Sequence, residues 1–252
     1  MEILPAVTLP PSKPLAYQHT PPRSEDYHSY RNCLRWEFGF SCPFCLTHEA
    51  DAVRSGASES LGLTGIEHIL PQSSHKNEKT VYTNCVYCCQ MCNRARSNKP
   101  SVEKPGGRKL LNPTQVAWSQ HFYSSADKLL PNPVDSDAKY THEAYNINDP
   151  RKVSLRKTRR VVIQNHLAFI KSDPDSKIAL LIRTARNPSL TQSERENLVR
   201  AAHDLRRYRD RVYEDLRTYA GEPADAPKRC RCNVTTYHVI PQVLKSQLIH
   251  IN

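Results

Sequence analysis

The residues best suited to chemistry lie close together, between positions 40 and 100. Two Cys-x-x-Cys pairs bracket a Glu-His dipeptide; one asparagine precedes the second pair and another follows it directly. Two such pairs can complete the tetrahedral shell of a zinc ion. Carboxylate and amide oxygens suit a hard divalent cation, and histidine can take a proton near neutral pH. The residues concerned are Cys42, Cys45, Glu67, His68, Asn84, Cys89, Cys92 and Asn93.

The second cysteine pair is ambiguous from spacing alone. Residues 85–92 contain two consecutive Cys-x-x-Cys pairs, Cys85 with Cys88 and Cys89 with Cys92. Either pair has the two-residue spacing that zinc sites use.

In residue order and spacing, this stretch resembles the HNH endonuclease domain, a ββα-metal nuclease module, in its four-cysteine zinc-containing form. The resemblance is carried by CPFC, EHILPQS, the asparagine of YTN, and CQMCNRARSN. EHILPQS and NRARSN also resemble the HNH domains of RNA-guided CRISPR effectors. The match covers about a quarter of the chain, and it departs from the commoner pattern in having Glu67 for Asp and Asn93 for the last His.

The resemblance implies a structural zinc, because four thiolates leave no position open for substrate. Its register selects the later of the two consecutive pairs. Cys85 and Cys88 then fall on usually apolar positions, where buried cysteine behaves as a small hydrophobic residue. The implied zinc ligands are Cys42, Cys45, Cys89 and Cys92.

The resemblance also implies hydrolysis of a DNA phosphodiester with one catalytic divalent metal, Mg²⁺ or Mn²⁺. His68 would be the general base that activates water, since its pKa lies near the operating pH. Glu67 and Asn93 would bind the catalytic metal. Asn84 would hold the loop that carries His68, and Arg96 would contact a substrate phosphate, with a solvated arginine as the alternative.

Charge is distributed unevenly along the 252 residues, whose net charge is +11. Residues 1–150 hold 15 basic and 15 acidic residues, whereas residues 151–252 hold 21 and 10. Lysine and arginine contacts to phosphate supply most sequence-independent affinity for nucleic acid. We therefore expect the neutral part, which holds the nuclease module, to cut DNA and the basic part to bind it. RNA is the alternative nucleic acid. The run RKVSLRKTRR at 151–160 is expected to contact the DNA backbone; a solvated helix face is the alternative.

The expected fold class is α+β, with a zinc-stabilised ββα-metal module between mostly helical flanking regions. Residues 1–23 are predicted to be a proline-rich extended arm, and residues 24–112 the nuclease domain with its structural zinc. Residues 113–150 are predicted to form a helix and linker, and residues 151–252 a basic, mainly helical region. The predicted segments are helices over 25–38, 89–97, 112–130, 158–171, 176–186 and 191–219, strands over 65–70 and 81–86, a loop over 46–64 and a linker over 131–150.

The last long helix begins with a capping box, Thr191 with Glu194. Apolar residues recur seven apart as far as about Tyr219, which is typical of a helix–helix seam. The seam can pair across a homodimer through 191–219 or within the chain, and we expect a hairpin with 158–186.

Nine cysteines with no evident signal peptide indicate thiolates used for metal, not disulfides. With no apolar run long enough to span a bilayer, we expect a cytoplasmic protein without a membrane partner. Near the end of the sequence, Cys230, Cys232 and His238 could form half of a second metal site, for which no fourth ligand is evident.

The first functional expectation is thus a DNA endonuclease in antiphage defence, alone or with a partner ATPase. A site-specific restriction or homing nuclease is one alternative. A zinc-containing nucleic-acid-binding module that does not cut is the other.

Overall fold

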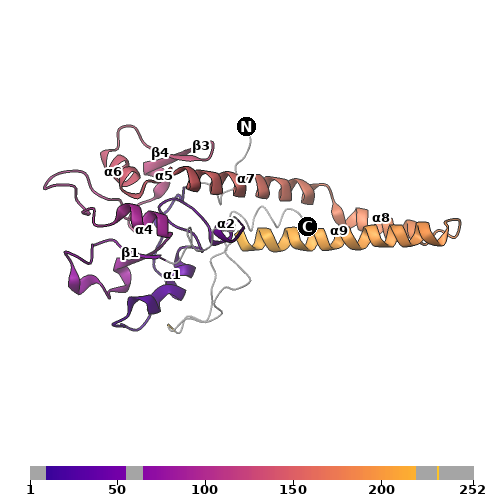
Figure 1. Ribbon diagram of the computed structural model, residues 1–252, viewed down its shortest axis with the longest axis horizontal. Helices are drawn as coiled ribbons and strands as arrows, with labels where there is room; N and C mark the ends of the chain where they lie inside the picture. Colours follow the sequence, from indigo (N-terminus) through magenta and orange to yellow (C-terminus); the bar gives the residue numbers. More distant parts are fainter. Residues whose placement is uncertain (1–9, 55–64, 220–231, 233–252) are drawn as a thin grey trace.

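The computed structural model describes residues 10–54, 65–219 and 232. Two small antiparallel sheets and several short helices form one body, from which long helices extend (Figure 1). The expected α+β class is confirmed. The elements are α1 (Arg31–Glu37), α2 (Glu49–Arg54), β1 (Gly65–His68), β2 (Cys85–Cys88), α4 (Gln90–Arg96), α5 (Trp118–His121), β3 (Phe122–Ser125), β4 (Lys128–Pro131), α6 (Ser136–Tyr145), α7 (Pro150–Lys171), α8 (Pro174–Ala185) and α9 (Gln192–Tyr219), with 3-10 turns at Tyr27–Tyr30, Lys76–Glu78 and Tyr82–Asn84.

The first sheet pairs β1 with β2, in a register that sets His68 opposite Cys85. β2 leads directly into α4 through Cys89, which is the N-cap of that helix. The Cys89 sulfur accepts a hydrogen bond from the backbone N–H of Cys92 at 3.4 Å, so it satisfies one of the free donors of the first turn. The strand, strand, helix order matches the prediction for this stretch.

The proline-rich arm contacts the body over its described part, residues 10–23, which have no helix or strand. The backbone N–H of Leu15 donates to the carbonyl of Pro113 at 2.9 Å. The hydroxyl of Tyr17 donates to the carbonyl of Cys85, in β2, at 2.8 Å. The arm therefore lies against the sheet that carries His68.

The segment 112–130 corrects a prediction, because it does not form one helix. It contains only the short α5, after which β3 and β4 form a hairpin turned at Ala126, where φ is 51°. Phe122 and Leu129 are both 1% exposed because alternate residues of the hairpin face the body. Their spacing along the sequence also fits a helical repeat, which is why the pattern predicts a helix.

Two further segments predicted to lack regular structure contain helices. The expected linker at 131–150 holds α6, whose N-cap Asp135 accepts a hydrogen bond from the backbone N–H of Ala138 at 2.8 Å. The expected loop at 46–64 holds α2, while residues 55–64 lie outside the described part of the chain.

α7, α8 and α9 form the extended part of the molecule (Figure 1). α7 starts at Pro150, eight residues before the predicted start, and runs unbroken to Lys171. α9 packs along α8 and α7, and its buried side chains include Val212 and Leu216. The seam of α9 therefore pairs within the chain, as expected, and its capping box forms: the N–H of Thr191 donates to the Glu194 carboxylate at 2.7 Å.

Candidate metal centre and the adjoining pocket

The four cysteines predicted to bind zinc converge in one buried cluster. Their sulfur atoms all lie within 4.8 Å of one another, and each residue is at most 1% exposed. Four thiolates at such distances can hold a zinc ion in a closed, structural site. The cluster also shows which of the two consecutive pairs takes part. Its members are Cys42, Cys45, Cys89 and Cys92.

A tight turn presents the first pair of sulfurs. Phe40 and Leu46, on either side of it, have φ values of 54° and 60°. The turn closes through two hydrogen bonds of 2.8 Å, from the N–H of Cys42 to the carbonyl of Thr47 and from the N–H of Leu46 to the carbonyl of Cys42. The Thr47 hydroxyl lies 3.1 Å from the sulfur of Cys45, where it can donate to a thiolate.

A buried lysine from α7 reaches the same cluster. Lys152 is 1% exposed, and its ammonium donates to the sulfur of Cys92 at 3.2 Å and to the carbonyls of Tyr145 and Asn146 at 2.7 and 3.0 Å. Burial alone would lower the pKa of Lys152, but the neighbouring cysteine thiolates raise it above its usual value. Because zinc with four thiolates carries a net charge of −2, a cation here stabilises the loaded site, and the donor set fits zinc.

The basic run at 151–160 is partly buried against the cysteine turn. Arg156 donates to the carbonyl of Cys45 at 2.9 Å, and Arg159 donates to the carbonyl of Leu46 at 2.6 Å. Both arginines are buried, at 3% and 1% exposure. Together with Lys152 they tie α7 to the cysteine turn, so three of the six basic side chains of the run are unavailable to the DNA backbone.

A pocket of about 330 Å³ opens between β1, the loop after it and α4. Glu67, His68 and Asn93 all line it, as do Arg96 and Gln72. The structure therefore brings together the residues that the sequence singled out for a catalytic metal and a general base. The pocket adjoins the cysteine cluster, since Asn93 directly follows Cys92 in α4.

The ring of His68 is fixed by two hydrogen bonds. Its Nε2 lies 2.9 Å from the carbonyl oxygen of Lys79, to which it donates, and its Nδ1 accepts from the side-chain amide of Gln72 at 2.8 Å. These bonds select the tautomer with the proton on Nε2, so Nδ1 carries the basic lone pair. Burial lowers the pKa of His68, which keeps the imidazole neutral at pH 7. Sequence reasoning did not identify Gln72.

Asn84 holds the loop that follows β1. Its Oδ1 accepts from the backbone N–H of Leu70 at 2.8 Å, and its Nδ2 donates to the carbonyls of Leu70 and Glu78 at 3.2 and 3.0 Å. These bonds join both ends of the segment 70–78 to the start of β2. The position is the one that the orienting role predicted for Asn84 requires.

Glu67 and Arg96 form a buried ion pair, with 3.2 Å between Oε1 and Nε and exposures of 5% and 1%. Burial raises the pKa of Glu67 to about 8, although Arg96 opposes the shift. The guanidinium of Arg96 also donates to the carbonyl of Ser97 at 3.1 Å. The solvated alternative for Arg96 is therefore wrong, because its guanidinium is buried and paired with Glu67. The contact of Arg96 with a substrate phosphate stays a prediction.

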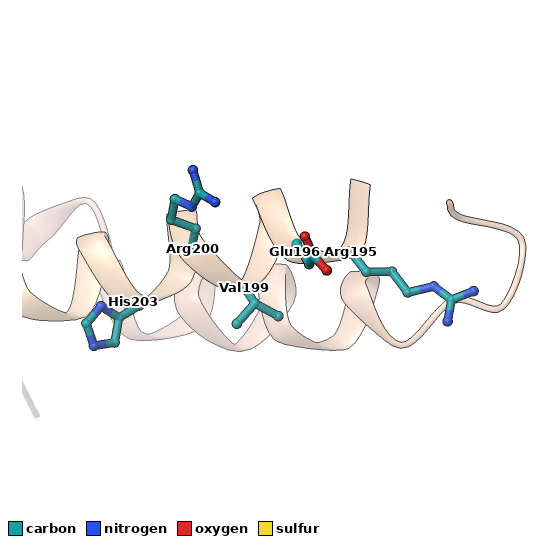
Figure 2. A pocket seen from close by; sticks show the side chains of 5 residues that line it. All are labelled: Arg195, Glu196, Val199, Arg200 and His203. Carbon is teal, nitrogen blue, oxygen red and sulfur yellow. The ribbon is translucent and has the colours of Figure 1, made fainter. Parts of the chain in front are cut away.

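A second hollow, of about 430 Å³, lies on α9 and has no such convergence. Its lining residues all come from that one helix, and their side chains splay apart (Figure 2). No other described element lines it, so it offers no enclosed site. The lining residues are Arg195, Glu196, Val199, Arg200 and His203.

The fold and the cysteine cluster together define the class of this protein. It is an α+β protein with a buried four-cysteine cluster that could hold zinc. No family model, no curated protein and no solved structure matches the chain. None of the helices within the described residues is long and apolar enough to cross a membrane.

Proposed function

We propose that this protein is a metal-dependent endonuclease of the HNH type that hydrolyses DNA phosphodiester bonds. One observation carries the proposal. His68, Glu67 and Asn93 line a single pocket on a strand, strand, helix unit whose helix begins at the cysteine cluster.

His68 is the general base in this proposal. The carbonyl of Lys79 holds the ring proton on Nε2, so Nδ1 can take the proton of the attacking water. In the free protein, the amide of Gln72 occupies Nδ1. Gln72 must therefore turn away before water can bind there, which its half-buried position permits.

Glu67 and Asn93 would hold one divalent cation, Mg²⁺ or Mn²⁺, through a carboxylate and an amide oxygen. Bound there, the cation would stabilise the charge that develops on the phosphate and on the leaving oxygen. Arg96 already faces the carboxylate of Glu67, so cation and guanidinium compete for it. The role of Arg96 is then to keep a buried carboxylate paired in the metal-free protein.

The same ion pair favours a second candidate function, a zinc-containing nucleic-acid-binding module that does not cut. Under that reading, Arg96 neutralises Glu67 permanently, and the pocket binds no metal. The two candidate functions differ in whether bound DNA is cut and whether that cutting requires His68.

The test is incubation of supercoiled plasmid with the full chain and either Mg²⁺ or Mn²⁺. We expect wild type to cut, and His68→Ala to cut about 10²–10⁴-fold more slowly. His75→Ala is the matched control, because His75 is an exposed histidine of the same loop, and it should cut like wild type. DNA binding without cutting in both cations would favour the binding module. Sequencing the ends of the cleaved DNA then distinguishes two kinds of nuclease. A site-specific restriction or homing enzyme gives one recurrent end sequence, whereas a general nuclease gives many.

A further inference from the structure

A second group of metal-ligating side chains lies outside the four-cysteine cluster. The ligand atoms of His19, Cys33 and Cys232 all lie within 4.8 Å of one another. Nδ1 of His19 is 3.0 Å from the sulfur of Cys232, which is 3.6 Å from the sulfur of Cys33. The three residues are buried, at 6%, 2% and 4% exposure. They come from the arm, from α1 and from a position near the end of the sequence.

The arm is fixed where it presents the imidazole. The carboxylate of Glu37 accepts hydrogen bonds from the backbone N–H groups of Gln18 and His19 at 2.8 and 2.6 Å. Glu37 lies one helical turn after Cys33 in α1, so one face of that helix both presents a thiol and anchors the arm. The hydroxyl of Tyr82 also donates to Glu37, at 3.2 Å, which holds the carboxylate in place.

We propose that His19, Cys33 and Cys232 form a second zinc site in the reduced protein. Imidazole nitrogen and thiolate sulfur are the ligands that zinc prefers. Two sulfurs that each lie about 2.3 Å from a tetrahedral zinc are about 3.8 Å apart, which is close to the distance between Cys33 and Cys232. A bound zinc would hold the arm and Cys232 against α1.

Cys232 gains two partners, His19 and Cys33, that spacing along the sequence could not reveal. A tetrahedral zinc needs one ligand beyond the three described. Cys230 and His238, which the sequence also singled out, lie outside the described residues.

Cys232 is disulfide-bonded in the structure, and a disulfide sulfur is not a thiolate ligand. Zinc binding therefore requires reduction first. Two equivalents of an external thiol convert the disulfide to two cysteine thiols and are themselves oxidised to one disulfide. Zn²⁺ then binds Cys33 and Cys232 with release of their thiol protons. Disulfide and zinc are alternative states of the same sulfur.

The test is the zinc content of the full chain, reduced, reloaded with Zn²⁺ and desalted. A thiol count in denaturant with chelator confirms reduction when it finds all nine cysteines. We expect two zinc ions per wild-type chain and one in either His19→Ala or Cys33→Ser. His19→Cys supplies another zinc ligand and should restore two. Cys85→Ser, a buried cysteine of neither group, should keep two.

Two results would overturn the second site. One is a single zinc per fully reduced wild-type chain. The other is two zinc ions in both His19→Ala and Cys33→Ser, which would place the second ion elsewhere. Cys42→Ser tests the first site separately and should lower the wild-type content by one. Loss of one zinc in Cys230→Ser or His238→Ala would support the second site and name its fourth ligand. The proposal does not depend on nuclease activity.

Discussion

The ammonium of Lys152 lies 3.2 Å from the sulfur of Cys92, a residue 60 positions earlier in the chain. The contact joins the first turn of a long helix to the first turn of a short one, and it places a positive charge against a cluster that becomes anionic when it binds zinc. The basic run of α7 therefore acts partly inside the molecule, at the four-cysteine cluster.

Lys152→Met should weaken zinc binding about 10–100-fold, because it removes a charged hydrogen-bond donor from a metal ligand while keeping most of the side-chain volume. Zinc affinity can be measured by competition with a chromogenic chelator. Lys157→Met is the matched control, since Lys157 lies on the same helix but is exposed, and its affinity should equal that of wild type. Equal affinities for all three proteins would contradict the role of Lys152.

Asn84→Ala should free the loop that follows His68. The amide of Leu70 then loses its acceptor, so its hydrogen exchange should accelerate, and the chain should lose about 1–3 kcal/mol of stability. Asn84→Asp keeps that acceptor but loses the donations to the Leu70 and Glu78 carbonyls. It should protect the Leu70 amide while still slowing DNA cutting. Unchanged exchange in Asn84→Ala would argue against the orienting role.

Arg96→Met should destabilise the metal-free protein by about 3–5 kcal/mol when stability is measured above pH 8, where the buried Glu67 carboxylate of the wild type is ionised and paired. If Glu67 binds the catalytic cation, Mg²⁺ should raise the thermal midpoint of this variant more than that of wild type. The double variant Glu67→Gln with Arg96→Met has no carboxylate to pair and should show neither effect. An equal response to Mg²⁺ in Arg96→Met and wild type would count against Glu67 as a ligand.

His48 should make the protein sensitive to mild acid. Burial and, secondarily, the charge of Arg159 lower its pKa to about 3, against an ordinary value of 6.5. As pH falls below 6.5, the unfolded chain binds the proton and the folded one does not, so stability falls by about 1.4 kcal/mol per pH unit until the folded pKa is reached. Stability falls in acid because the folded protein accommodates His48 only in its neutral form.

Between pH 6.5 and pH 5, this group alone should remove about 2 kcal/mol. Denaturant unfolding of wild type and His48→Gln at both pH values measures the difference, and any acid sensitivity of the cysteine cluster is common to the two proteins. The variant should lose less stability than wild type over this interval. Parallel losses would show that His48 titrates normally.

DNA binding should depend on exposed cations of α9, since part of the α7 run is buried. Arg200 and Arg211 are exposed and lie three turns apart on one side of that helix. Replacing both with Gln should weaken DNA binding whatever the sequence and reduce the slope of log affinity against log salt by about two. Lys139→Gln, an exposed lysine of α6, serves as the control. A slope that does not change would place the DNA contacts elsewhere.

Local spacing predicted much of the candidate site. A Cys-x-x-Cys pair needs only a tight turn or a helix start to aim both sulfurs at one point, so Cys42 and Cys45 could be assigned from spacing alone. The choice of Cys89 with Cys92 over Cys85 with Cys88 needed the register of the family resemblance as well. The pattern around His68 likewise lies within one hairpin and the helix after it. The capping box at Thr191 is local too, and it forms as predicted.

What the sequence could not predict depends on contacts between distant segments. A run of basic residues has the same pattern whether its helix is solvated or buried. The local sequence therefore does not predict the contact between Lys152 and Cys92. His19 and Cys33 reach Cys232 from about 200 residues away, and no spacing rule spans such a distance. The hairpin around Ala126 was missed because the apolar spacing of its short strands also fits a helix.

The start of α7 sets a lower limit on how far the chain can be shortened. A fragment that stops at residue 112, where the cysteine pairs and the pocket are already complete, would lack the cation at Cys92 and both guanidinium groups that bond the carbonyls of Cys45 and Leu46. Such a fragment would contain the four cysteines without the lysine that neutralises their charge and the two arginines that hydrogen-bond to their turn. We therefore expect the shortest stable fragment that keeps the cysteine cluster to extend at least to Arg159.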